Sequence, residues 1–171
     1  MSVTTHSLRQ LVEEPSRALG RITNASLGDL RYIGVLQQTI FRPSLWWSDW
    51  LLQRHLEGEG RWARVYKIEE KVVAYMLYHR EGSIACLDIL GVAPDYQKLG
   101  IGQKLISRLK AETSGLGKIV LFTFADSDTN LYFYRNLGFR LVREPCTPYT
   151  DGRPRVCLEY PFVRRIKSAK L

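Results

Sequence analysis

The chain has 171 residues, of which 45% are hydrophobic and 25% charged, the size and composition of one globular domain with a full core. This excludes collagen, coiled coil and general disorder. The 25 basic residues outnumber the 17 acidic ones, and the net charge of +8 favours anionic partners such as a phosphate-bearing cofactor or an acidic substrate. No apolar run of about 20 residues could span a bilayer, and no basic helix with interleaved aromatic residues argues for nucleic acid.

The N-terminal residues lack the basic start and apolar segment of a secretory signal, so we expect a cytoplasmic protein. The cysteines are odd in number and form no C-x-x-C pair, which predicts neither a disulfide nor a zinc–thiolate site: Cys86, Cys146 and Cys157. The histidines are far apart, so a histidine metal site would have to be assembled by the fold alone: His6, His55 and His79. We therefore expect no metal.

One domain is expected over residues 17–162, because no repeat or Pro/Gly/Ser-rich linker divides the chain. A short N-terminal arm over residues 1–16 would precede it, and a basic tail over residues 163–171 would follow. Much of the excess positive charge gathers toward this end, in Arg153, Arg155 and the tail. We expect these side chains to be solvated.

Residues 19–23 predict a first strand. Two helices follow, each with candidate N-cap residues: the first begins at Asn24 or Ser26 and the second at Ser44 or Ser48. Pro43 separates them. The second helix should end near residues 58–60 and carry a set of apolar side chains: Trp46, Trp47, Trp50, Leu51 and Leu52.

The rest of the chain alternates strands and helices. Strands are predicted over 61–68 and 71–79, joined by a turn at Glu69–Glu70, and over 83–92, with a further strand at 118–125 and a closing pair at 139–143 and 155–160. Helices are predicted from Ile101 through Leu109 and over 129–136. The order β-α-α-β-β-β-α-β-α-β-β predicts an α/β (α+β) fold with a mixed central sheet rather than a doubly wound one.

Two glycines, Gly100 and Gly102, follow an apolar strand where a helix begins. Missing side chains there let a ligand approach the backbone, and the free N–H groups of a helix start bind phosphate. A dinucleotide-binding G-x-G-x-x-G motif would need glycine in place of Leu105, and a P-loop would need Ser or Thr in place of Ile119. The residues leave a phosphate-binding loop or a simple tight turn open.

The segment Asp126–Asn130 places oxygen-bearing side chains as a calcium loop does. An EF-hand, however, needs Gly at the sixth position and Glu at the twelfth, where this chain has Leu131 and Leu137. The D-x-D-x-[TV] phosphatase signature also fails at Asn130. A turn that caps the next helix is the simpler prediction.

Three blocks in order resemble the GNAT superfamily of acetyl-CoA-dependent N-acetyltransferases. They are the strand end Leu90–Gly91–Val92, the Q/R-x-x-G-x-G/A loop at residues 97–102, and Phe133–Tyr134–Arg135–Asn136–Leu137–Gly138–Phe139. The resemblance implies that the loop backbone holds the pyrophosphate of acetyl-CoA and that the strand end pairs with its pantetheine arm. The implied cofactor-binding residues are Leu90, Gly91, Val92, Gln97, Lys98, Leu99, Gly100, Ile101, Gly102, Gln103 and Asn130.

The resemblance also suggests two catalytic residues. Tyr134 matches the tyrosine that protonates the departing thiolate in many members, although a buried tyrosine could simply pack the helix. Asp88 is the sole charge in residues 84–92 and matches a position where some members carry a carboxylate that takes the amine proton. Strand alternation predicts that it shares a face with Cys86, Leu90 and Val92. A structural, paired aspartate is the alternative.

Within the family, residues 148–158 are similar to the closing hairpin of bacterial ribosomal-protein N-terminal acetyltransferases. The chain departs from that group at Phe122, where a glutamate base is usual, and at Ser127, where an asparagine is usual and Asn130 lies nearby.

The predicted function is direct, metal-independent acetyl transfer from acetyl-CoA to a primary amine of a peptide, protein or small molecule. A non-catalytic acyl-CoA-binding module or sensor is the alternative. The acceptor and the oligomeric state stay open.

Overall fold

The computed structural model describes residues 20–142, 148–149 and 151–162. The whole predicted N-terminal arm over residues 1–16, residues 17–19 of the predicted domain, the basic tail, Cys146 and residue 143 of the predicted strand over 139–143 lie outside these residues. In the described part, the four α-helices and seven strands follow one another along the chain in the predicted order, and the strands form one sheet. This confirms the mixed α/β fold. None of the described helices combines the length and apolar character needed to cross a membrane.

The strands are β1 (Arg21–Asn24), β2 (Arg61–Ile68), β3 (Lys71–Glu81), β4 (Ile84–Val92), β5 (Lys118–Phe124), β6 (Arg140–Leu141) and β7 (Arg155–Pro161). The α-helices are α1 (Leu27–Ile40), α2 (Asp49–Glu57), α3 (Ile101–Glu112) and α4 (Asp128–Asn136), and the short 3-10 helices are η1 (Pro43–Leu45) and η2 (Pro94–Tyr96). In the sheet the strands lie in the order β1-β2-β3-β4-β5-β7-β6. Among these described strands, β4 and β5 are the one pair that runs parallel.

Local chemistry explains several boundaries. The β2–β3 turn holds Glu69 and Glu70 at φ of 47° and 65°, the left-handed pair that a two-residue hairpin requires. Ser26, one of the two predicted candidates, caps α1. The backbone N–H of Ser26 donates to the Asp29 carboxylate at 2.9 Å in a capping box.

The second predicted helix begins later than its earliest candidate cap. Ser48 is the N-cap of α2, so Trp46 and Trp47 lie outside the helix, contrary to the prediction. The cause is the side-chain amide of Gln37, which donates to the Trp47 carbonyl and accepts the Trp47 N–H, both at 2.8 Å. These bonds hold Trp47 before the helix.

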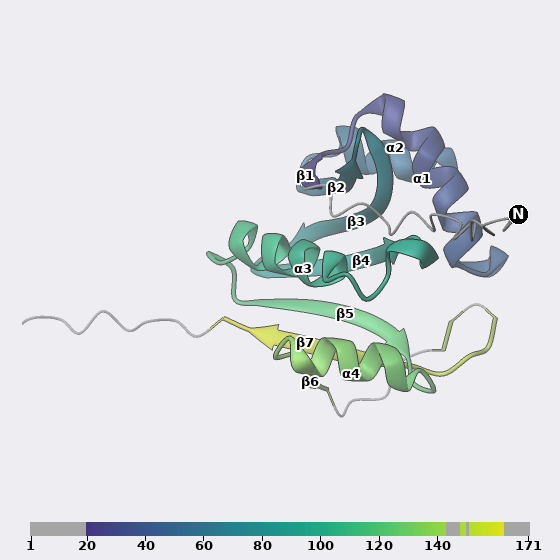
Figure 1. Cartoon of the computed structure of the whole chain (residues 1–171). Coiled ribbons are helices and arrows are strands. Elements are labelled where there is room, and N and C mark those ends of the chain that lie inside the picture. Colours follow the sequence, from purple (N-terminus) through teal and green to yellow (C-terminus); the bar gives the residue numbers. More distant parts are fainter. Residues whose placement is uncertain (1–19, 143–147, 150, 163–171) are drawn as a thin grey trace, which may run out of the picture.

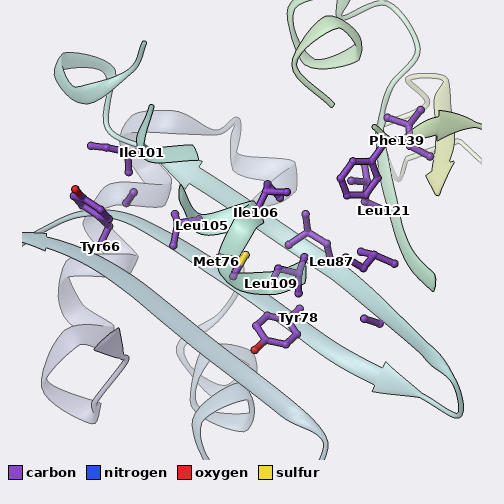
Figure 2. Close-up of a cluster of buried hydrophobic side chains, with 14 of the residues drawn as sticks. Tyr66, Met76, Tyr78, Leu87, Ile101, Leu105, Ile106, Leu109, Leu121 and Phe139 are labelled. Atoms are coloured by element: carbon purple, nitrogen blue, oxygen red, sulfur yellow. The ribbon is translucent and has the colours of Figure 1, made fainter. Parts of the chain in front are cut away.

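The sheet separates two clusters of buried apolar side chains, and Figure 1 labels the helices that cover its faces. Helices α3 and α4 pack on one face, and α1 and α2 on the other. Figure 2 shows the first cluster, in which side chains of α3 lie on those of the central strands: Leu105, Ile106 and Leu109 meet Met76, Tyr78 and Leu87.

A second set of contacts ties α3 to the sheet through Glu112. Its carboxylate accepts hydrogen bonds from Arg64 Nε at 3.0 Å, from Arg108 and from the Tyr78 hydroxyl. Burial alone would raise the pKa of Glu112, but these three hydrogen bonds hold it below its ordinary value.

A β-bulge in β4 sets the position of Asp88. Leu77 pairs with Ile89, and the next residue of β3, Tyr78, pairs with Leu87, so Asp88 is the extra residue. The bulge interrupts the alternation of side chains along β4. Leu90 and Val92 therefore pack toward α3, whereas Asp88 contacts α2 on the opposite face. The prediction that Asp88 shares a face with Leu90 and Val92 was wrong for this reason.

Candidate active site

The parallel strands β4 and β5 part midway along the sheet. Their pairing runs from Ile84 and Lys118 to Leu87 and Leu121. Beyond this point β4 continues to Val92 and β5 to Phe124 without pairing to each other, while β4 stays paired to β3 as far as Val92. One edge of β4 is therefore open over its last residues.

A cavity of about 540 Å³ lies where the strands part. Its wall on the α1–α2 side is mostly aromatic and apolar, and includes Phe41, Trp46 and Trp47. Residues of α4, namely Asn130 and Tyr134, line the other side. The cavity is therefore lined from both faces of the sheet, at the level where β4 and β5 are no longer paired.

Tyr134 is a half-buried residue of α4 that lines this cavity. Its ring makes edge contacts with Phe133 and Phe139, at centroid distances of 5.0 and 5.6 Å. Burial raises its pKa above the ordinary value, so the phenol keeps its proton at neutral pH and can donate it.

Asp88 lines the same cavity from β4. Its Oδ2 atom lies 3.0 Å from Nε2 of His55 and 2.8 Å from Nδ1 of His79. His55 is fully buried on α2, and the Nε2 of His79 lies 3.1 Å from a carboxylate oxygen of Glu81. Burial would lower the pKa of His79, but hydrogen bonds and the charges of Asp88 and Glu81 hold it above its ordinary value.

The predicted cofactor loop leads from β4 into α3. Gly100 is the N-cap of α3 with φ of +77°, and Lys98 also has a positive φ, of 62°. The first intrahelical bond runs from the Lys104 N–H to the Gly100 carbonyl at 3.0 Å, so the N–H groups of residues 101–103 have no partner within the helix. The Gln97 side chain donates to the Val92 carbonyl at 3.1 Å, which braces the loop against the strand end.

Two predicted site glycines have packing roles. A Cβ on Gly102 would lie 3.1 Å from the Phe133 ring, and a Cβ on Gly91 would lie 2.9 Å from the Tyr75 ring. Ile101 is buried in the core, so its backbone alone is available to a ligand. Leu99, in contrast, is exposed.

Near α4 the helix-cap prediction for residues 126–130 is confirmed, since Ser127 caps α4 and accepts the Asn130 N–H. The Asn130 amide donates to Thr123 Oγ1 at 3.1 Å, which fastens α4 to β5.

The two arginines expected to be solvated instead pack on aromatic rings. Arg153 bonds Asp126 at 2.7 Å and covers Phe124, and Arg155 lies over Phe122, 4.4 Å from its ring centre.

Sequence reasoning missed His55 and His79, which reach Asp88 from 33 and 9 residues away. No spacing motif links the three residues, and only the unexplained charge of Asp88 inside an apolar strand hinted that it has partners.

The comparisons with known proteins concern the family and the fold. Residues 29–139 match the model of the acetyltransferase (GNAT) family. The ribosomal-protein-S18-alanine N-acetyltransferase of Escherichia coli superposes with a TM-score of 0.76 at 23% identity, covering 90% of this chain and 100% of that one. NAA60 of Arabidopsis thaliana, solved with a bisubstrate analogue, gives 0.74 at 16% identity, covering 84% and 98%.

PaiA N-acetyltransferase of Thermoplasma acidophilum, solved in complex with coenzyme A, gives a TM-score of 0.69 at 13% identity, covering 84% and 99%. Comparison with curated protein sequences gives no match. The family model spans most of the described domain, including the parting strands, the glycine loop and α4. The chain belongs to the GNAT family of acetyltransferases.

Proposed function

We propose that this protein transfers the acetyl group of acetyl-CoA to a primary amine by direct attack within a ternary complex. One observation carries the proposal: a half-buried phenol, Tyr134 of α4, and a carboxylate, Asp88 of β4, line the same cavity from opposite faces of the sheet. Transfer to an amine needs one group that gives a proton to sulfur and one that takes a proton from nitrogen.

Acetyl-CoA would bind on the α3–α4 side of the parting strands. The backbone N–H groups from Lys98 to Gln103, of which those of residues 101–103 have no partner within α3, would hold the pyrophosphate. The open edge of β4 at Leu90–Val92 would pair with the amide groups of the pantetheine arm, as an added strand does. Gln97 and Asn130 would act by bracing this site, because their amides bond the strand end and β5.

The reaction then moves two protons. The neutral amine enters from the α1–α2 side and its nitrogen attacks the thioester carbon, passing one proton to Asp88 as the new bond forms. A backbone N–H of the open β4 edge stabilises the carbonyl oxygen as charge develops there. The carbon–nitrogen bond forms, the carbon–sulfur bond breaks, and Tyr134 gives its proton to the departing thiolate.

The aromatic wall built by Trp46, Trp47 and Phe122 would surround the acceptor. Phe122 occupies the position where the ribosomal-protein group usually has its glutamate base, which supports Asp88 as the base in this chain. A peptide N-terminus and a small amine both fit this chemistry.

A thiol-release assay with acetyl-CoA against peptides with free N-termini, lysine peptides, polyamines and aminoglycosides tests the proposal. We expect thiol release that depends on one class of amine, with the acetylated product identified by mass spectrometry. Calorimetric binding of acetyl-CoA with no product from any amine would instead support the acyl-CoA-binding module, and the acetyltransferase proposal would fail.

A further inference from the structure

Three side chains of types that can bind metals converge beside the cavity from three different elements. They are His55 on α2, His79 on β3 and Asp88 in the bulge of β4, and their ligand atoms all lie within 4.8 Å of one another. They lie 24 and 9 residues apart in the sequence, so only the fold brings them together. His55 is buried, and the other two are mostly buried.

The partners of His55 restrict where its proton can lie. Its Nδ1 lies 3.2 Å from the Leu51 carbonyl, which can only accept. A neutral His55 therefore carries its proton on Nδ1 and directs the bare Nε2 at Asp88 Oδ2, 3.0 Å away. Two groups with lone pairs then face each other, and a cation between them would relieve the repulsion.

His79 repeats this arrangement with its nitrogens exchanged. Its Nε2 lies 3.1 Å from the Glu81 carboxylate and its Nδ1 lies 2.8 Å from the same Asp88 Oδ2 atom, so a neutral ring has one proton for two carboxylate acceptors. When that proton lies on Nε2, the bare Nδ1 is directed at Asp88 and can bind a metal ion. An acceptor on the far nitrogen is the arrangement that orients histidine ligands of metals.

The spacing fits a small divalent ion. Ligand bonds of about 2.0–2.1 Å in a tetrahedral zinc site place neighbouring ligand atoms about 3.4 Å apart, so the observed contacts of 2.8 and 3.0 Å would open by a few tenths of an ångström. Three protein ligands leave the fourth position free, and here it can face the cavity that Asp88 lines.

We propose that His55, His79 and Asp88 form a binding site for a divalent transition-metal ion, and that an ion held there withdraws the Asp88 carboxylate from proton transfer. The two imidazoles select zinc over magnesium or calcium, which prefer oxygen ligands. Zinc is therefore an inhibitor bound at the amine side of the cavity. The inhibition, unlike the binding, rests on the proposed acetyl transfer.

A neighbouring group, His79, Glu81 and Cys86, also has its ligand atoms within 4.8 Å. Its Glu81 side chain is 70% exposed, so this set is held less firmly than the one around the buried His55. The variant Cys86→Ser separates the two sites, because only the second uses the thiol.

The binding experiment uses the untagged, chelator-treated full chain, titrated with zinc by calorimetry and with cobalt by visible absorption. We expect one bound zinc per chain and the absorption bands of tetrahedral cobalt. His79→Gln should weaken zinc binding by about 10- to 100-fold or more, the loss seen when even an outer partner of a metal ligand is removed. His55→Gln should do the same, and a thermal melt establishes that each variant is folded.

His6→Gln and Cys86→Ser are the matched controls, and both should bind zinc as the wild type does. If zinc does not bind the wild type, or binds folded His79→Gln equally well, the proposed metal site is overturned. The contacts of His55 and His79 with Asp88 would then be ordinary hydrogen bonds. Loss of binding in Cys86→Ser would assign the ion to the other group.

The inhibition experiment adds zinc to a turnover assay on the amine found above. Zinc should lower turnover of the wild type, and the ratio of rates with and without zinc should return toward one in His79→Gln. Equal inhibition of both proteins would overturn the inhibitory role. No turnover on any amine, with zinc binding intact, would refute the acetyl transfer and leave the metal site standing.

Discussion

Replacing Tyr134 by phenylalanine isolates the hydroxyl of the proposed acid. The ring contacts with Phe133 and Phe139, at 5.0 and 5.6 Å, do not use the hydroxyl, so Tyr134→Phe should keep α4 packed. Its unfolding free energy should change by less than about 1 kcal/mol, the net worth of a single hydrogen bond. Acetyl-CoA affinity should be unchanged, because the proposed cofactor contacts are made by the α3 loop and β4.

The expected loss is catalytic. A positioned general acid contributes at least about 100-fold, so kcat of Tyr134→Phe should fall by that factor, equivalent to about 2.7 kcal/mol of transition-state stabilisation. Because burial raises the pKa of Tyr134 above its ordinary value, its proton is present throughout the neutral range. Wild-type kcat should therefore show no loss from tyrosine ionisation below pH ~10.

Steady-state thiol release on the identified amine, with calorimetric titration of coenzyme A in parallel, makes the measurement. Turnover of Tyr134→Phe within a few-fold of the wild type would refute the reasoning. Solvent or another group would then protonate the thiolate, and the tyrosine would serve only to pack α4.

Asp88→Asn should lower kcat on the amine substrate while leaving coenzyme A affinity unchanged, and a variant with wild-type kcat would return Asp88 to a structural role. Gly100→Val must hold a branched side chain at φ of +77°, so it should lose about 1–2 kcal/mol in denaturant unfolding and bind coenzyme A more weakly by calorimetry; unchanged values for both would contradict the loop geometry. The depressed pKa of Glu112 contributes stability above its ordinary pKa that is lost as the pH falls through the folded value. Acid unfolding of Glu112→Gln should therefore show a shallower pH dependence below pH ~4.5 than the wild type, and identical slopes would count against the Arg64 contact.

Local patterns predicted most of the secondary structure, because the cause of each element lies within a few residues. The β2–β3 hairpin follows from apolar strands flanking a two-residue turn, and the start of α1 follows from Ser26 and Asp29. The start of α2 was harder to predict. The amide of Gln37, ten residues away, holds Trp47 outside the helix, and no local rule weighs such a bond.

The site was predictable only where a family motif marks it. The loop before α3 and Tyr134 on α4 were found from such motifs, and their roles stay proposals. The face occupied by Asp88 was predicted wrongly because alternation cannot anticipate a bulge, which depends on the partner strand. The pairing of Asp88 with His55 and His79 arises from tertiary packing, which no sequence spacing encodes.

The parting of β4 and β5 also has a mechanical consequence. Four residue pairs join the half-sheet β1–β4 to the half-sheet β5–β7, fewer than the eight between β3 and β4 or the seven between β5 and β7 on either side of this junction. A cofactor arm bonded along the open edge of β4 would add hydrogen bonds beside this short strand pairing. A bound ligand would then stabilise the folded sheet against unfolding for as long as the site is occupied.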